Sequence, residues 1–217
     1  MRHSPKAMSC ALTMATMVLT ITVGAGSASA EMVAFWNFNG FDPDNGPIVA
    51  ASSGSGTVNC TSFGTGLTSF AGTDVNAPTG VLAGDSVGLT GSSNNGAFAL
   101  IEFSSVGYND LSLSFAARRS ATGFGNDRVE ALVGGVWTLV STFNPSTTAW
   151  TTVTVDLSSF SSLNNSAAAL RLVFDGATSG SGTVRFDNLL LSGSAVPGPG
   201  ALALLGCAGI VARRRRR

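Results

Sequence analysis

The chain has 217 residues, enough for one domain with short appendages, and only 11% of them are charged. Its formal net charge of zero hides a segregation, because residues 31–196 contain five Arg, no Lys and all twelve acidic residues, a balance of about −7. The only His is His3, so the body excludes Ser-His-Asp or Cys-His catalysis, a His-ligated zinc and a Schiff-base lysine, and its charge predicts no binding to nucleic acid.

Residues 1–30 have the three parts of a secretory signal peptide. A positively charged start is followed by an apolar run over 10–23 and by small residues that end in Ala28-Ser29-Ala30. We therefore expect cleavage between Ala30 and Glu31. The apolar run is short and a cleavage site follows it, which favours cleavage over the alternative of a retained membrane anchor.

Residues 31–194 are predicted to form one all-β domain, an antiparallel two-sheet β-sandwich of jelly-roll-like topology. Apolar and polar residues alternate in several short runs, as in strands with one buried face, and turns rich in Gly and Ser separate them. No long stretch has helical periodicity, although 158–170 has room for one short helical turn. The expected strands are 32–38, 47–51, 57–61, 86–90, 97–103, 111–115, 128–133, 136–142, 153–157, 170–174 and 183–192.

Two features of this pattern predict local geometry. Asn94-Asn95-Gly96 and Gly134-Gly135 are typical of tight hairpins. In the last strand the alternation of apolar and polar residues shifts by one position after Phe186. This shift predicts either a β-bulge at Asp187-Asn188 or burial on both faces. The first strand is also apolar on both phases, so the first and last strands suit covered positions and are candidates to pair with each other.

The closing strand also resembles that of carbohydrate-binding modules with jelly-roll folds. The resemblance lies in Arg185-Phe186-Asp187-Asn188-Leu189, with support from 115–119, 123–125 and 150–157. It implies a fold more than a function.

Sugar binding requires exposed aromatic rings beside polar groups. Trp137 and Trp150 open strands next to loops and are candidate stacking residues, whereas Trp36 lies among apolar residues and is expected in the core.

Calcium is the one cofactor for which the body offers candidate ligands, and no other cofactor is expected. Asp42 and Asp44 lie in a tight turn with Asn45, but the spacing is not that of an EF-hand. The jelly-roll resemblance places Asp187 beside the first strand, where that fold often holds a structural calcium ion. The alternative is a turn closed by hydrogen bonds from its own Asp and Asn side chains.

Catalysis is not expected. Cys60 is the only thiol of the body and has no His or Lys to activate it, so a small buried residue is the better interpretation. Glycosidases need two carboxylates that flank one cleft. Asp127 with Glu130 is one pair of that kind on paper, but nothing in the sequence singles it out. The threonines of 147–154 form a local cluster and no repeating ladder, so antifreeze activity is not inferred.

The C-terminal segment 195–217 has three parts in order. A breaker over 195–200 precedes an uncharged apolar stretch over 201–212, which is predicted to be helical. A helix from Pro199 through this stretch spans about 21 Å, short of the ~30 Å hydrocarbon core, so crossing requires local thinning and snorkelling of the arginine stems. The alternative is a basic tail on an apolar patch. The terminal block, expected on the cytoplasmic side, is Arg213, Arg214, Arg215, Arg216 and Arg217.

This tail resembles the PEP-CTERM sorting domain of Gram-negative bacteria, which has also been catalogued as a C-terminal domain of ice-binding proteins. Val196-Pro197-Gly198-Pro199 matches the family's Val-Pro-Glu-Pro, with Gly198 in place of the usual Glu. The resemblance implies an exosortase as processing partner at the inner membrane, followed by transfer to the cell surface or the exopolysaccharide matrix.

Together these features predict an exported, non-catalytic β-sandwich protein that is anchored in the membrane in transit and delivered to the cell envelope or extracellular matrix. The alternative is a polysaccharide-binding module on the cell surface.

Overall fold

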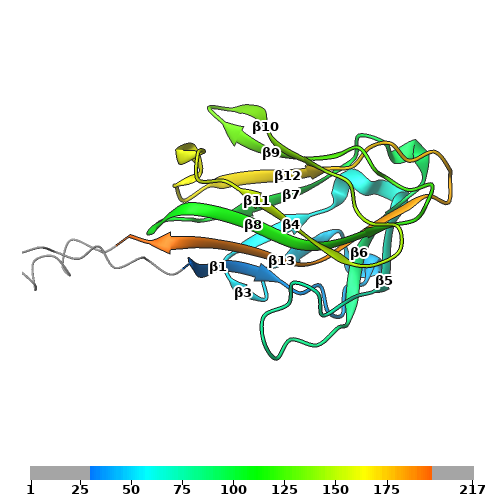
Figure 1. Cartoon of the computed structure of the whole chain (residues 1–217), viewed down its shortest axis with the longest axis horizontal. Coiled ribbons are helices and arrows are strands. Elements are labelled where there is room, and N and C mark those ends of the chain that lie inside the picture. Colours follow the sequence, from blue (N-terminus) through cyan, green and yellow to red (C-terminus); the bar gives the residue numbers. More distant parts are fainter. Residues whose placement is uncertain (1–29, 197–217) are drawn as a thin grey trace, which may run out of the picture.

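The strands of this chain build two antiparallel sheets that pack face to face (Figure 1). The computed structural model describes residues 30–196, so the predicted signal segment up to residue 29 and the tail from residue 197, with the apolar helix expected there, lie outside the described residues. Within 30–196 the chain forms thirteen strands and four short 3₁₀ turns. The predicted all-β, two-sheet sandwich is confirmed.

The larger sheet has seven strands, with β13 at its centre. β13 pairs with β8 along one edge and with β6 and β1 along the other, in the order β11-β8-β13-β1-β3 with β6 and β5 as a branch. Figure 1 shows β13 in orange beside β1 in blue. The strands of this sheet are β1 (Ala30–Trp36), β3 (Ser53–Gly54), β5 (Leu67–Ala71), β6 (Asp85–Thr90), β8 (Tyr108–Arg119), β11 (Thr151–Asp156) and β13 (Thr183–Ala195).

The smaller sheet has six strands in the order β10-β9-β12-β7-β4-β2. Its strands are β2 (Ile48–Ala50), β4 (Gly56–Asn59), β7 (Phe98–Phe103), β9 (Asp127–Val133), β10 (Val136–Phe143) and β12 (Ala168–Val173). The 3₁₀ turns η1 (Pro43–Asn45), η2 (Thr61–Gly66), η3 (Ser92–Asn94) and η4 (Ser161–Leu163) lie in the connections. The last of them is the short helical turn expected within 158–170.

The core between the sheets is dominated by phenylalanine. Rings from both sheets and from the connecting segments meet edge to face or stacked, at centroid distances of 5.2 to 6.5 Å. Such pairs stabilise a core beyond the area that they bury. The cluster consists of Phe38, Phe63, Phe115, Phe124, Phe143, Phe174 and Phe186. Trp36 is fully buried in the same core, as the sequence predicts.

The local geometry predicted for the first and last strands is confirmed. β1 and β13 pair with each other, from Ala30 opposite Ser194 to Trp36 opposite Leu189. The pairing of β13 with β8 shifts register between Asp187 and Leu190, and Asn188 has a φ of +48°, so the predicted bulge is present. β13 is also buried on both faces along much of its length, so the two alternatives hold together. Segment 73–76 contributes to this burial, because its residues hydrogen-bond to Asp187 and Asn188.

The two expected hairpins have different outcomes. Gly134 and Gly135 join β9 to β10 as a two-residue turn, both with positive φ, as a tight hairpin requires. The prediction for Asn94-Asn95-Gly96 is wrong, because this turn carries the chain from β6 in one sheet to β7 in the other. Asn94 and Asn95 instead tie neighbouring segments together by donating to the carbonyls of Thr90 and Ala177.

Within the described residues, no helix has the length and apolar character needed to cross a lipid bilayer.

Candidate functional site

The outward side of the six-stranded sheet carries the densest set of functional side chains, and we call it the outer face. It is built from alternate residues of neighbouring strands. Trp137 and Leu139 of β10 lie opposite Leu132 and Glu130 of β9, and Arg171 of β12 lies between Glu130 and Leu100 of β7. Leu139 of this face is 55% exposed. Aromatic, aliphatic and charged groups are therefore neighbours on one open surface.

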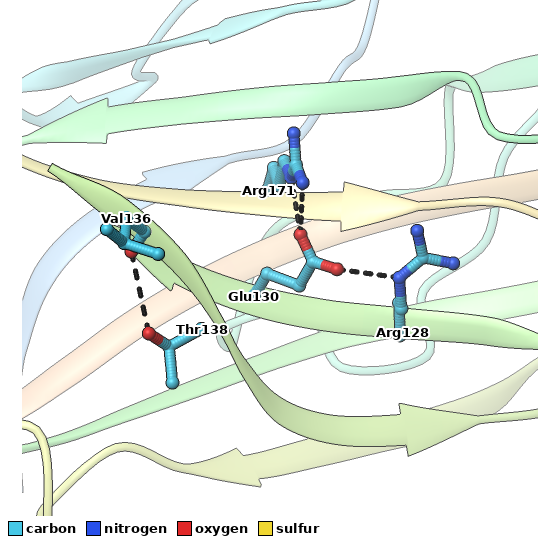
Figure 2. A network of polar contacts seen from close by, with 5 residues as sticks. All are labelled: Arg128, Glu130, Val136, Thr138 and Arg171. Atoms are coloured by element: carbon cyan, nitrogen blue, oxygen red, sulfur yellow. Dashed lines mark hydrogen bonds and ion pairs between the residues drawn. The ribbon is translucent and has the colours of Figure 1, made fainter. Parts of the chain in front are cut away.

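An ion-pair network fixes the centre of this face (Figure 2). Arg128 donates through Nε to one carboxylate oxygen of Glu130 at 2.6 Å, and Arg171 donates through Nε to the other at 2.5 Å. Burial raises the pKa of Glu130, but the hydrogen bonds from Arg128 and Arg171 outweigh burial and hold that pKa below its usual value. Glu130 is therefore ionised at neutral pH and keeps both guanidinium groups in place.

Arg171 also orients the aromatic residues of the outer face. Its guanidinium lies 4.5 Å from the centroid of the Trp137 ring and 5.3 Å from that of Phe98. Guanidinium groups stack favourably on aromatic faces at such distances. Because Glu130 holds Arg171, the half-buried ring of Trp137 is supported from beneath and stays at the surface of the sheet.

The two candidate tryptophans do not form one platform. Trp137 belongs to the six-stranded sheet, whereas Trp150 immediately precedes β11 of the seven-stranded sheet. Both are half-buried, in contrast to the fully buried Trp36. Only Trp137 has an ordered set of charged and aromatic neighbours on the outer face.

The predicted calcium ligands have other partners in the structure. Asp42 caps η1 and accepts hydrogen bonds from Asp44 N at 3.0 Å and from Asn45 Nδ2 at 3.2 Å. Asp187 is fully buried and accepts from Thr73 N and from its neighbour Asn188 N. Among residues 30–196, no three His, Cys, Asp or Glu side chains gather closely enough to hold a metal ion. These contacts match the alternative of a self-bonded turn at Asp42, and calcium binding stays a prediction.

The carboxylate pair Asp127 and Glu130 lies on opposite faces of β9. Glu130 points to the outer face, whereas Asp127 is 1% exposed and lies next to inward-facing Val129 in the alternation of the strand. The two groups therefore do not flank one cleft, and the arrangement needed for glycoside hydrolysis is not formed by this pair.

Asp127 is an isolated buried acid. One of its oxygens accepts from Asp175 N at 2.9 Å, and the other has no hydrogen-bond partner within residues 30–196. It lines a hollow of about 460 Å³ together with Gly125, Asn126, Thr142, Phe143 and Asn144. Burial raises the pKa of Asp127 to about 7, against the lowering effects of the Asp175 amide and of Arg119.

Some of the remaining residues singled out from the sequence lie within the described region, and others lie outside it. Cys60 is fully buried and its thiol pKa is raised by burial, as expected of a packing residue. Ala30 and Glu31 begin β1, and Val196 follows β13. Ala28, Pro197, Gly198, Pro199 and the arginines 213–217 lie outside the described residues, so the sorting motif stays a prediction.

The partners of Trp137 were not predicted from the sequence. Arg171, Glu130 and Phe98 each occupy an outward position in an alternating run, so the face on which each lies could be predicted. Their contact could not be predicted, because Arg171 and Glu130 are 41 residues apart and only the pairing of β12 with β9 brings them together.

Comparisons with known proteins concern the fold alone. The sequence matches no protein-family model and no curated protein sequence. Among solved structures, it is similar to the CBM22-1 xylan-binding domain of Xyn10C from Paenibacillus barcinonensis (14% identity, 79% of this chain and 100% of that one, TM-score 0.44). It is also similar to the xylan-binding module CBM15 (11% identity, 62% and 95%, TM-score 0.40).

A third similar structure is the K2 cleaved adhesin domain of Lys-gingipain (13% identity, 63% of this chain and 88% of that one, TM-score 0.39). Carbohydrate-binding modules and an adhesin domain thus resemble the same sandwich. A fold of this kind does not by itself identify a ligand.

Proposed function

We propose that this chain is a non-catalytic polysaccharide-binding module, and that the outer face around Trp137 contacts the sugar. The observation that carries the proposal is the pre-organised ring of Trp137, supported by Arg171, which Glu130 and Phe98 hold in turn. Sugar rings stack their apolar faces on aromatic side chains and hydrogen-bond to polar groups at the edge of the ring. Arg128 and the exposed Glu102 supply such groups on the same face.

The position of this site on an outward sheet face favours a polymer over a small ligand. The outer face extends over neighbouring strands up to β10 at the edge of the sheet, so a chain of sugar residues can lie across the strands. Side chains that are already ordered lose little conformational entropy on binding, which strengthens the interaction.

Replacement of Trp137 by alanine tests the site. We expect Trp137→Ala to weaken binding to a neutral polysaccharide by about 30-fold, the loss of one aromatic hot-spot residue. Screening on a glycan array and titration with soluble xylan measure the effect, and Trp137→Phe should retain part of the affinity.

Trp150→Ala is the matched control, because it removes the same side chain from the other sheet and should bind as the parent does. Unchanged affinity in Trp137→Ala, with circular dichroism showing a folded protein, would place the sugar site elsewhere or remove the function.

The place where the module acts is the second part of this proposal. We infer that the chain is exported, held transiently in the inner membrane by its tail, and then transferred to the cell surface or extracellular matrix by an exosortase-type enzyme. Support comes from the Ala28-Ser29-Ala30 site, the Val196–Pro199 motif and the arginines at 213–217.

Deletion of Arg213–Arg217 tests the tail. Without these cations the apolar segment lacks its cytoplasmic stop, so we expect the protein to shift from the cell-surface fraction to the soluble periplasmic or secreted fraction. Cell fractionation with intact-mass analysis measures the distribution and both termini. Replacement of the five arginines by lysines keeps the charge and should preserve sorting, whereas an unchanged distribution after deletion would contradict the inference.

A further inference from the structure

Two arginines of the seven-stranded sheet face each other and have no ion-pair partner among residues 30–196. Arg118 of β8 and Arg185 of β13 are directly opposite in the pairing of these strands, on the side of the sheet that faces away from the core. Like charges in this arrangement repel, and the repulsion destabilises a sheet. Burial lowers the pKa of Arg185, and the charge of Arg118 adds to this lowering.

The isolation of this pair is unusual for an acidic body. Of the five arginines in residues 30–196, Arg128 and Arg171 pair with Glu130. Arg119 donates to the side chain of Asn144 and to three backbone carbonyls. Within the same residues, Arg118 and Arg185 have neither an ion pair nor a side-chain hydrogen bond. Asp187 follows two residues after Arg185 but accepts hydrogen bonds from Thr73 N and Asn188 N, and no acidic residue among 30–196 forms an ion pair with the two arginines. An anion outside the domain therefore fits these charges.

Aromatic packing holds one of the two guanidinium groups in position. Arg185 lies 3.9 Å from the centroid of the Phe70 ring, a strong stacking geometry. Phe70 in turn lies over Gly88 of β6, where an added Cβ would come within 2.5 Å of the ring. The glycine therefore makes room for the ring, and the ring orients the arginine.

These groups form a row across the sheet. The strand pairings place Thr68, Gly88, Arg185 and Arg118 in line on β5, β6, β13 and β8. Trp150 immediately precedes Thr151 of β11, which pairs with Ala117 next to Arg118, so Trp150 lies near the β8 end of the row. With strands about 4.8 Å apart, the four paired positions span about 14 Å, which accommodates a few sugar residues.

We propose that this row, named here the arginine face, binds a carboxylated polysaccharide. Planar guanidinium groups match carboxylates in a bidentate geometry, and the aromatic residues in the row suit the apolar faces of sugars. Two cations suit a polymer with one carboxylate per sugar. They are too few to offset the repulsion between the acidic body and a nucleic acid, whose affinity grows with the number of phosphates neutralised. The arginine face lies on the sheet opposite Trp137, so it is independent of the site proposed above.

Polygalacturonate is the probe, and its fully methyl-esterified form is the control polymer, because the two share a backbone and differ in the free carboxylates. We expect the full-length protein to bind polygalacturonate in affinity electrophoresis and not the esterified polymer. Binding should be lost at about 1 M salt, where the Debye length falls to about 3 Å. Equal binding of both polymers would overturn the proposal.

Charge-removing variants locate the site. Arg118→Gln and Arg185→Gln should each weaken polygalacturonate binding at least about tenfold, the effect of losing one charge-assisted hydrogen bond. The melting temperature of Arg118→Gln should not fall, because the substitution relieves repulsion between the two arginines, whereas Arg185→Gln also loses the stacking on Phe70, so its fold is checked by circular dichroism. Arg185→Lys keeps the charge without the planar stacking and should bind with intermediate affinity.

Two variants of the other sheet serve as controls. Arg128→Gln removes the same charge, and Trp137→Ala removes the proposed neutral-sugar contact; both should bind polygalacturonate as the parent does. Parental affinity in Arg118→Gln and Arg185→Gln would overturn the proposal and leave the Trp137 site untouched. Binding of dextran sulfate or of a single-stranded oligonucleotide in preference to polygalacturonate would also overturn it.

Discussion

Replacement of Phe174 by alanine is expected to remove about 3–5 kcal/mol of the free energy of unfolding, the usual loss for a fully buried phenylalanine. Phe174 is completely buried and stacks on Phe186 of β13 at 5.7 Å. It also meets Phe63, Phe124 and Phe143 edge to face at 5.7 to 6.5 Å. A cavity at this position therefore separates rings from both sheets at once. Chemical denaturation followed by tryptophan fluorescence measures the loss.

Phe98→Ala is the matched control for this prediction. Phe98 is half-buried on the outer face, where its ring stacks on the guanidinium of Arg171, so we expect a loss of about 1 kcal/mol. Phe174→Leu should recover part of the stability. If Phe174→Ala and Phe98→Ala had the same free energy of unfolding, packing of the aromatic cluster would not be what holds the two sheets together.

The free energy of unfolding is expected to fall as the pH rises from about 4 to about 7. Burial raises the pKa of Asp127 and of Asp187 from 3.8 to about 7 each. For Asp187, the amides of Thr73 and Asn188 act against burial, and the charge of Asp85 acts with it. Between these two pH values the folded protein keeps a proton on each group that the unfolded chain has released, so folding is favoured at the acidic end of the window and loses this contribution above pH 7.

The size of the effect follows from the displacement of the pKa. A difference of one in pKa between the folded and unfolded states corresponds to about 1.4 kcal/mol of the free energy of unfolding. Asp127 alone therefore accounts for about 4 kcal/mol across the window. Glu130, whose pKa is lowered, contributes with the opposite sign below this window. Denaturant titrations at several pH values measure the slope.

Asp127→Asn should reduce this slope by about half, because the amide keeps the acceptor for Asp175 N and no longer titrates. Asp74→Asn removes an exposed carboxylate and is the matched control for the change in charge. A flat slope in the parent would show that neither buried acid keeps its proton in the folded protein across this window, and a slope unaltered by Asp127→Asn would show this for Asp127 alone.

Much of the strand arrangement could be predicted because alternation reports which face of a strand is buried. The bulge at Asp187-Asn188 could be predicted because the alternation of apolar residues shifts by one position after Phe186. The pairing of the first and last strands could be predicted because both are apolar at successive positions. β5 was not predicted, because it lacks this alternation. Its Phe70 points away from the core onto Gly88, so the strand has no regular alternation.

The candidate sites were less accessible to prediction. Trp137 could be selected as an aromatic residue beside a turn, but its supporting Arg171 and Glu130 come from two other strands. Trp150 had the same signal and lies on the other sheet. Nothing in the sequence indicated that Arg118 and Arg185 are neighbours, since only the register of β8 with β13 sets them face to face.

Composition and periodicity alone predict an acidic, all-β body that lacks the His and Lys side chains of common catalytic sites. They also predict the sorting signals expected at both ends. Each of these properties depends on residue types or on neighbours in the chain, which the linear order contains. The tertiary structure was needed to assign strands to sheets, to separate Trp137 from Trp150, and to leave two arginines facing each other. These outcomes depend on pairings between residues tens of positions apart, and they are set by which combination of faces buries the phenylalanine core.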